Sequence, residues 1–171
     1  TKVVAWLLAP QGNHGSGQKP LRTFLSLAWK TARERDEQEK HLDALSKAKV
    51  GDLSGVRVCT ERVAGDRRSD LVLEDDRRQL FVVIENKIKA GHHQGKLDDY
   101  REWAQTQSEI PLLILLSPLN RVTGCDDVIS VAYRDWIPRI NRLDAKSERC
   151  NILRNQFTSN MERIMGTGEE N

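Results

Sequence analysis

Apolar positions recur with a helical period through the first part of the chain. Residues 3–8 form an apolar stretch that predicts a short helix ending near Pro10. A second helix is predicted from Pro20, because proline suits the first helical turn. Its core face shows the spacing i, i+3, i+4 and i+7, with Leu21, Phe24, Leu25 and Ala28. Leu42 and Leu45 continue this pattern, and Gly51 ends the helical region.

The pattern then changes to short runs that alternate apolar and polar residues or are continuously apolar. These runs predict strands over residues 56–60, 70–73, 80–85, 112–116 and 128–132. Further helices are expected over residues 92–107, 136–143 and 147–165. The first three strands are joined by short polar segments, which favours antiparallel hairpins. This order predicts an α/β domain with a mixed sheet flanked by helices, whose core spans about residues 1–135 and is followed by C-terminal helices over 136–165.

Composition narrows the class of protein. A chain of 171 residues with 38% hydrophobic and 30% charged residues is expected to form one folded domain. No apolar run approaches the ~18 residues of a membrane span, and the net charge of +2 says little about partners. The three cysteines, Cys59, Cys125 and Cys150, lie far apart in the sequence. We therefore expect neither a disulfide framework nor a zinc site, and we expect the protein to work in a reducing, cytoplasmic setting. The helical pattern is already present at Thr1 without a methionine, so we expect the natural protein to extend upstream.

A group of charged residues follows two neighbouring strands. Glu85 and Lys87 lie two residues apart at the end of an apolar strand, so their side chains point to one face. Asp70 begins the preceding strand. A hairpin through residues 74–78 would pair the start of one strand with the end of the next and place Asp70 beside Glu85.

Two carboxylates and an ammonium group on one face suit phosphodiester hydrolysis. Magnesium prefers oxygen ligands and keeps several waters, so Asp70 and Glu85 are candidate ligands. Lys87 would position the attacking water and offset charge in the transition state. The alternative is an ordinary ion pair at a sheet edge, since Glu-x-Lys alone is common. The combination with Asp70 after a hairpin favours catalysis.

These segments resemble the motifs of the PD-(D/E)XK nuclease superfamily. Residues 67–73 are similar to the motif that supplies the first aspartate, and residues 81–88 to the motif that supplies the acid and the lysine. More narrowly, residues 84–88 are similar to an Ile-Glu-Asn-Lys-Ile core found in a bacterial group. The resemblance extends to Ala5-Trp6-Leu7-Leu8 and Asn13-His14-Gly15-Ser16-Gly17, and it covers roughly residues 1 to 135. It implies a restriction-endonuclease-like mixed sheet, Mg²⁺ as the metal with Mn²⁺ as a substitute, and nucleic acid, expected to be DNA, as the partner.

The chain departs from that group at two places. A helix with a Gln-Leu-x-x-Tyr-like signature usually follows the core, and here it reads Lys96-Leu97-Asp98-Asp99-Tyr100. Lys96 stands at the usual glutamine position, and Gln94 lies two residues earlier. Superfamily members often carry a glutamate on the first helix, whereas this chain has none before Glu34.

Several further residues have both a functional and a structural interpretation. Glu61 is expected to end the first strand, where it would either bind the metal or support a metal ligand. An exposed acid with no such role is an equally good interpretation. His14 lies in a glycine-rich loop that could hold a phosphate, although turn chemistry is favoured. Polar and basic residues flank the proposed centre in the sequence. They are expected either to contact DNA phosphates or to form a solvated rim, and they are Arg68, Lys89, Gln94 and Lys96. Three other polar and aromatic side chains are expected to be structural, namely Asn86, Tyr100 and Trp103.

The leading hypothesis is a Mg²⁺-dependent endonuclease acting on DNA, in antiviral defence or restriction. The alternatives are a catalytically inactive nucleic-acid-binding module and a protein-interaction subunit of the same fold. One centre cuts one strand at a time, so cutting both strands would require a homodimer or sequential nicks.

Overall fold

The computed structural model of the chain describes residues 1–35, 38–64, 67–75, 77, 80–88, 94–119, 127–144 and 146–166. The N-terminal helices are α1 (Lys2–Leu8), α2 (Lys19–Glu34) and α3 (Glu39–Val50). Three strands follow, β1 (Arg57–Ala64), β2 (Arg67–Asp75) and β3 (Leu80–Asn86). The remaining elements are α4 (Gln94–Gln107), β4 (Pro111–Ser117), β5 (Val128–Ala132), α5 (Tyr133–Ile140) and α6 (Glu148–Gly166).

The five strands form one mixed sheet in the order β1-β2-β3-β4-β5. The pairs β1–β2 and β2–β3 are antiparallel, as the short polar connections predict. The pairs β3–β4 and β4–β5 are parallel. A parallel pair needs a crossover, and α4 provides it between β3 and β4. The sheet therefore changes from antiparallel to parallel at β3, the strand that carries Glu85.

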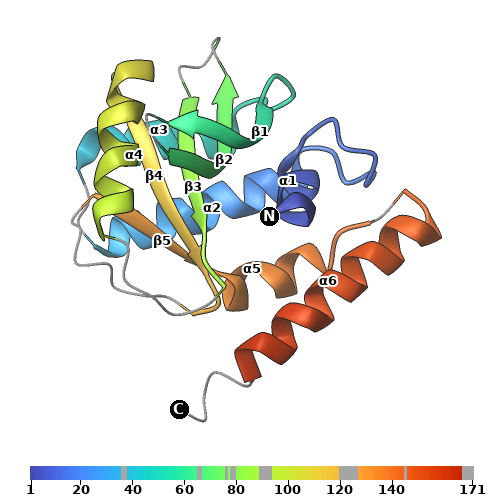
Figure 1. Cartoon of the computed structure of the whole chain (residues 1–171). Coiled ribbons are helices and arrows are strands. Elements are labelled where there is room, and N and C mark those ends of the chain that lie inside the picture. Colours follow the sequence, from blue (N-terminus) through green and yellow to red (C-terminus); the bar gives the residue numbers. More distant parts are fainter. Residues whose placement is uncertain are drawn as a thin grey trace.

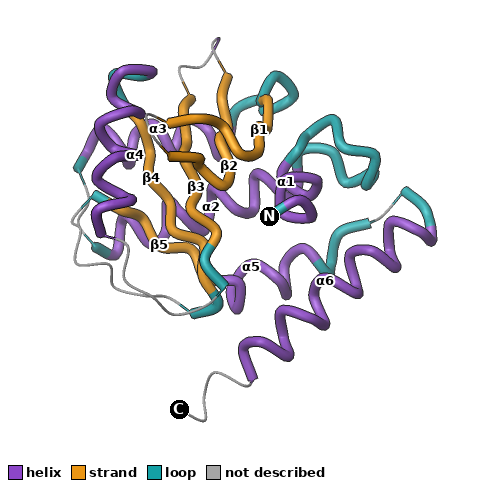
Figure 2. The backbone as a smooth tube through the Cα atoms, in the orientation of Figure 1, coloured by secondary structure: helices purple, strands orange, loops and turns teal. Residues whose placement is uncertain are grey.

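Helices cover both faces of the sheet (Figures 1 and 2), and each face has its own apolar core. One core combines α1, α2, α3 and α5 with alternate residues of the central strands, such as Leu71, Val82 and Ile84. The other lies under α4 and includes Val72, Val83 and Tyr100. Strand β4 is buried on both faces, as its continuous apolar run predicts. The predicted α/β fold, a mixed sheet flanked by helices, is confirmed.

The C-terminal helix α6 extends beyond the sheet and packs mainly on α5 (Figure 1). Its few buried residues include Cys150 and Met161, and the ring of Phe157 lies 6.0 Å from that of Tyr133 in α5. Ile152 and Leu153 on α6 are exposed large apolar residues. No helix within the described part of the chain is both long and apolar enough to span a membrane.

Several predicted boundaries are wrong. The strand expected over residues 56–60 extends to Ala64, and α5 begins at Tyr133 rather than near Trp136. In addition, the strand expected over residues 70–73 spans Arg67–Asp75, so Asp70 lies inside β2 and does not begin it. The first error arises because β1 is an edge strand whose later side chains are solvated, with Val63 62% exposed, so hydropathy gives no strand signal there. The second arises because α5 follows β5 directly, without a polar linker to separate their apolar patterns.

Candidate active centre

The antiparallel ladder of β2 and β3 ends with Leu71 opposite Ile84. Asp70 and Glu85 are the next residue of each strand beyond that pair, so continuing the register sets them against each other. Directly opposed residues of an antiparallel pair have their side chains on the same face. In addition, the Asn86 backbone N–H donates to Oδ2 of Asp70 at 2.9 Å. The hairpin therefore brings the two carboxylate-bearing positions together, as the sequence predicts.

Glu85 lies on the α4 side of β3. Its strand neighbour Val83 belongs to the core under α4, and alternation gives Glu85 the same direction. The side chain is 8% exposed, so the carboxylate lies at the margin of an apolar layer. Burial of this kind requires partners or a cation, because an isolated buried charge is costly.

Lys87 continues the alternation just past the end of β3. Its backbone N–H donates to the carbonyl of Leu116 in β4 at 2.7 Å, which prolongs the parallel ladder by one step. The Lys87 side chain is therefore expected on the same face as Glu85 and is partly exposed. The strand pairing thus sets the direction of this ammonium group, and its catalytic role is a proposal.

Between these two residues, Asn86 points to the opposite face and is held there by Tyr133. The Tyr133 hydroxyl donates to Oδ1 of Asn86 at 2.7 Å, which confirms the expectation that Asn86 is hydrogen-bonded. Tyr133 is fully buried. Burial raises the pKa of Tyr133 well above its ordinary value, and the charge of Asp70 raises it further. The hydroxyl therefore remains a protonated donor at neutral pH.

Tyr133 is the residue of this centre that the sequence did not indicate. It opens α5, 47 residues from Asn86, and its apolar surroundings give the appearance of an ordinary core aromatic. A polar residue on the core side of β3 is the one available signal, because such a residue requires a partner. Its hydrogen bond holds the side chain of Asn86, the residue between Glu85 and Lys87.

Glu61 does not end the first strand, which corrects the expected boundary. It lies inside β1 between Thr60, which pairs with Leu71, and Arg62, which pairs with Ser69. That position is level with Asp70, as expected. However, Glu61 is exposed and has φ 55°, and the ladder skips it. The left-handed backbone turns its side chain out of the regular alternation, and this local break has no hydropathy signature.

The surroundings of His14 favour its structural reading. The ring is 2% exposed, its Nε2 is 2.9 Å from the carbonyl oxygen of Ala9, and its Nδ1 accepts the Ser16 backbone N–H at 3.0 Å. It also packs edge-on against Trp6, with ring centroids 5.4 Å apart. Both ring nitrogens thus bind within the loop rather than pointing to a phosphate.

The proposed nucleic-acid contacts are described only in part. Arg68 is exposed on β2, and its carbonyl accepts a hydrogen bond from the Tyr100 hydroxyl of α4. Lys89 and the side chains of Gln94 and Lys96 lie outside the described residues. Tyr100 is fully buried, as predicted, and it joins α4 to the strand that carries Asp70.

Asp70 and Glu85 are the residues of this hairpin that would supply carboxylate oxygens to a divalent cation. Among the described residues, no group of three or more His, Cys, Asp or Glu side chains is placed to hold a metal. Magnesium can be held by one or two carboxylates while keeping several waters. Asp70 accepts one hydrogen bond from the backbone, and a carboxylate has enough lone pairs to accept that bond and also coordinate a cation.

Comparison with protein families places this hairpin in a known context. A family model described as the PD-(D/E)XK nuclease superfamily matches residues 1–122. The chain belongs to the PD-(D/E)XK nuclease superfamily. Comparisons with curated proteins and with solved structures gave no match. The matched span contains Asp70, Glu85 and Lys87, whereas Tyr133 lies beyond it.

Proposed function

We propose that this member of the PD-(D/E)XK superfamily hydrolyses phosphodiester bonds with the help of a divalent cation, Mg²⁺ or its substitute Mn²⁺. The observation that carries the proposal is the hydrogen bond from the Asn86 backbone N–H to Asp70, at the end of the β2–β3 ladder, which sets Asp70 beside the strand end that bears Glu85 and Lys87. Two carboxylates and an ammonium group suit such hydrolysis.

The chain's own residues divide the work as follows. Asp70 and Glu85 would hold the cation, which when bound supplies Lewis-acid polarisation of a phosphoryl oxygen and lowers the pKa of a bound water. Lys87 orients the attacking water and offsets the negative charge that develops on the phosphorus centre. The backbone N–H of Asn86 fixes the Asp70 carboxylate, so the ligand geometry is set before substrate arrives.

The substrate is proposed to be DNA, and the biological role defence against foreign DNA or restriction. The exposed side chain of Arg68 lies two residues from Asp70 on β2, where it can contact a phosphate. Such contacts position a strand without reading its sequence. Cleavage of both strands of a duplex calls for a homodimer or two successive nicks.

A cleavage panel tests this function. Duplex DNA, single-stranded DNA and RNA are incubated with the protein and Mg²⁺, Mn²⁺ or EDTA. We expect Lys87→Ala and Glu85→Gln each to lower the rate by ~10² or more, since each removes an electrostatic contributor to the transition state. Lys47→Ala is the matched control, because Lys47 is an exposed lysine of α3 whose Nζ pairs only with the neighbouring Asp43 among the ion pairs described.

The outcomes separate the three hypotheses. Cleavage by Lys87→Ala and Glu85→Gln at the wild-type rate would show that this centre is not the catalytic one. Binding of nucleic acid by the wild type, with no turnover in either metal, would favour the inactive binding module. Neither binding nor turnover would favour the protein-interaction subunit.

A further inference from the structure

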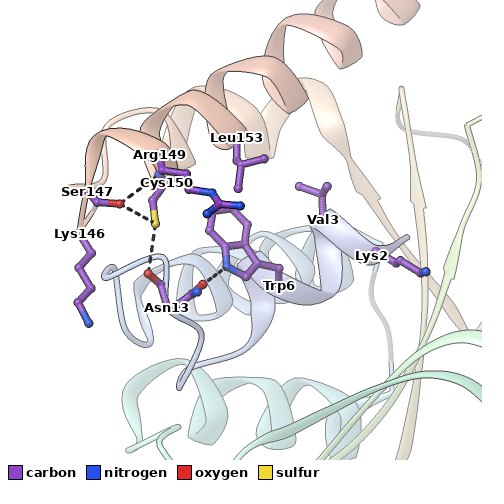
Figure 3. Close-up of a pocket in the computed structure, with 9 residues that line it drawn as sticks. All are labelled: Lys2, Val3, Trp6, Asn13, Lys146, Ser147, Arg149, Cys150 and Leu153. Atoms are coloured by element: carbon purple, nitrogen blue, oxygen red, sulfur yellow. Dashed lines mark hydrogen bonds between the residues drawn. The ribbon is translucent and has the colours of Figure 1, made fainter.

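A cavity of about 690 Å³ lies between α1 and the beginning of α6, and we refer to it as the α1–α6 groove (Figure 3). This volume is within the range of ~300–1,000 Å³ that is usual for ligand sites. Its apolar surface comes from both helices, through Val3, Trp6, Cys150 and Leu153. The sequence motifs discussed above do not indicate this groove.

The charged side chains that line the groove are all cationic. They are Lys2, Lys146 and Arg149, each exposed, and no acid is among the lining residues. Figure 3 shows Lys146 and Lys2 at opposite ends of the groove, with Arg149 between them. An apolar floor with a row of positive charges is complementary to a ligand that has planar apolar groups joined by anionic ones.

The walls of the groove are held by hydrogen bonds before any ligand binds. Trp6 Nε1 donates to Oδ1 of Asn13 at 2.7 Å, so the indole has one fixed orientation. The Cys150 thiol donates to the carbonyl of Asn13 at 3.2 Å, which joins α6 to the same loop. The backbone N–H of Lys146 donates to the carbonyl of His14 at 2.9 Å. A preorganised surface of this kind loses little entropy on binding.

Helix α6 connects the groove with the proposed active centre. Phe157 of α6 packs edge-on against Tyr133, with ring centroids 6.0 Å apart, and Tyr133 donates to Asn86. Arg149 lies eight residues before Phe157 on this helix, which corresponds to roughly 12 Å along its axis. At a spacing of about 3.4 Å per nucleotide, that distance is roughly three to four nucleotides of a stacked strand.

We propose that the α1–α6 groove binds an unpaired segment of the nucleic-acid substrate, with a base against Trp6 and phosphates along Lys146, Arg149 and Lys2. The proposal rests on the proposed nuclease function and specifies its substrate class as nucleic acid with a single-stranded region. A base can reach the indole only when it is not stacked within a duplex. Stacking on an aromatic ring combined with a cationic track is the general means of binding single strands.

Binding measured in EDTA tests the groove independently of cleavage. The probe is a fluorescein-labelled single-stranded oligothymidylate, followed by anisotropy beside the same sequence in a duplex. We expect the wild type to prefer the single strand, and Arg149→Glu and Lys146→Glu each to weaken binding by roughly tenfold or more, because each reverses a phosphate contact. Lys47→Glu on α3 makes the same charge change away from the groove and should weaken binding less than about twofold.

A second readout reports on the base itself. Oligothymidylate should quench tryptophan fluorescence in the wild type, and Trp6→Phe should remove most of that change and weaken binding by roughly fivefold or more. Circular dichroism of each variant checks that the fold is intact. Cleavage in Mg²⁺ and Mn²⁺ is measured on the same preparations.

Each result bears on one proposal or the other. Wild-type affinity in both charge-reversal variants, or an equal loss in Lys47→Glu, would overturn the groove while leaving the nuclease function in place. Equal affinity for the duplex, or no binding at all, would also overturn it. Groove-dependent binding without turnover in any metal would support the groove and refute the nuclease function. A change in oligomeric state of the variants without nucleic acid would assign the groove to a second copy of the chain instead.

Discussion

Removal of the Tyr133 hydroxyl tests how the strand between Glu85 and Lys87 is held. Phenylalanine keeps the ring of this fully buried residue, so Tyr133→Phe creates no cavity. It removes the donor to Oδ1 of Asn86. Loss of one partner of a buried hydrogen bond costs about 1–3 kcal/mol, and Asn86 is only half-buried, so we expect a loss of about 1–2 kcal/mol in the free energy of unfolding at neutral pH.

The penalty should shrink at alkaline pH. Burial and the charge of Asp70 raise the pKa of Tyr133 in the folded state, whereas an unfolded tyrosine titrates near pH 10. Above that pH the unfolded chain releases a proton that the folded chain retains, so the wild type loses stability as pH rises. Between about pH 9 and 11 this loss is about 1.4 kcal/mol. Tyr133→Phe lacks the group and is spared the loss.

Urea unfolding followed by tryptophan fluorescence, at about pH 7, 9 and 11, measures both effects. Other titrating groups are common to the two proteins and cancel in the difference between them. Asn86→Ala, alone and combined with Tyr133→Phe, completes a double-mutant cycle, and we expect a coupling of about 1 kcal/mol. A penalty that is the same at all three pH values would refute the raised pKa, and additive energies would refute the hydrogen bond.

Two further predictions concern other parts of the fold. Burial, assisted by Lys40 and opposed by Asp127, lowers the pKa of His41 in the folded state. The unfolded chain therefore takes up a proton that the folded chain resists, and the stability of the fold should decrease as pH drops below about 6.5. Thermal melts of His41→Gln should show a weaker decrease at acid pH, and an unchanged decrease would contradict this explanation. Gly15 has φ +79°, and a Cβ there would lie 2.2 Å from Cβ of Lys146, so Gly15→Ala should cost about 2 kcal/mol or more in urea unfolding. Gly17 has φ +55° with nothing within 4 Å, so Gly17→Ala should cost only about 1 kcal/mol, and equal costs would show that crowding at Lys146 is absent.

The position of Asp70 beside the end of β3 could be predicted from the sequence because it depends on local rules. Alternation fixes the faces of β3, and a short hairpin fixes which residues of β2 lie opposite. The long apolar runs of the central strands, such as that of β4, likewise stand out because both faces are buried. The metal, the substrate and the catalytic roles do not follow from these rules alone and remain proposals.

What the sequence does not show depends on contacts between distant segments or on single backbone angles. The bond from Tyr133 to Asn86 spans 47 residues, and the bond from Cys150 to Asn13 spans 137. No periodic pattern reports which helix will cover which end of the sheet. The exposed position of Glu61 follows from a left-handed φ at one edge-strand residue, which polarity cannot reveal.

The central position of β3 determines how the centre is lost when the protein opens. This strand is paired with β2 on one side and β4 on the other, while β1 is an edge strand. Fraying of β1 leaves both ladders of β3 in place. Breaking the whole β2–β3 ladder opens both apolar cores and so approaches the free energy of global unfolding. Asp70 and Glu85 lie one step past the last pair of that ladder, Leu71 with Ile84, so they can separate when only this end of it frays. We therefore expect the centre to open before the middle of the sheet that supports it.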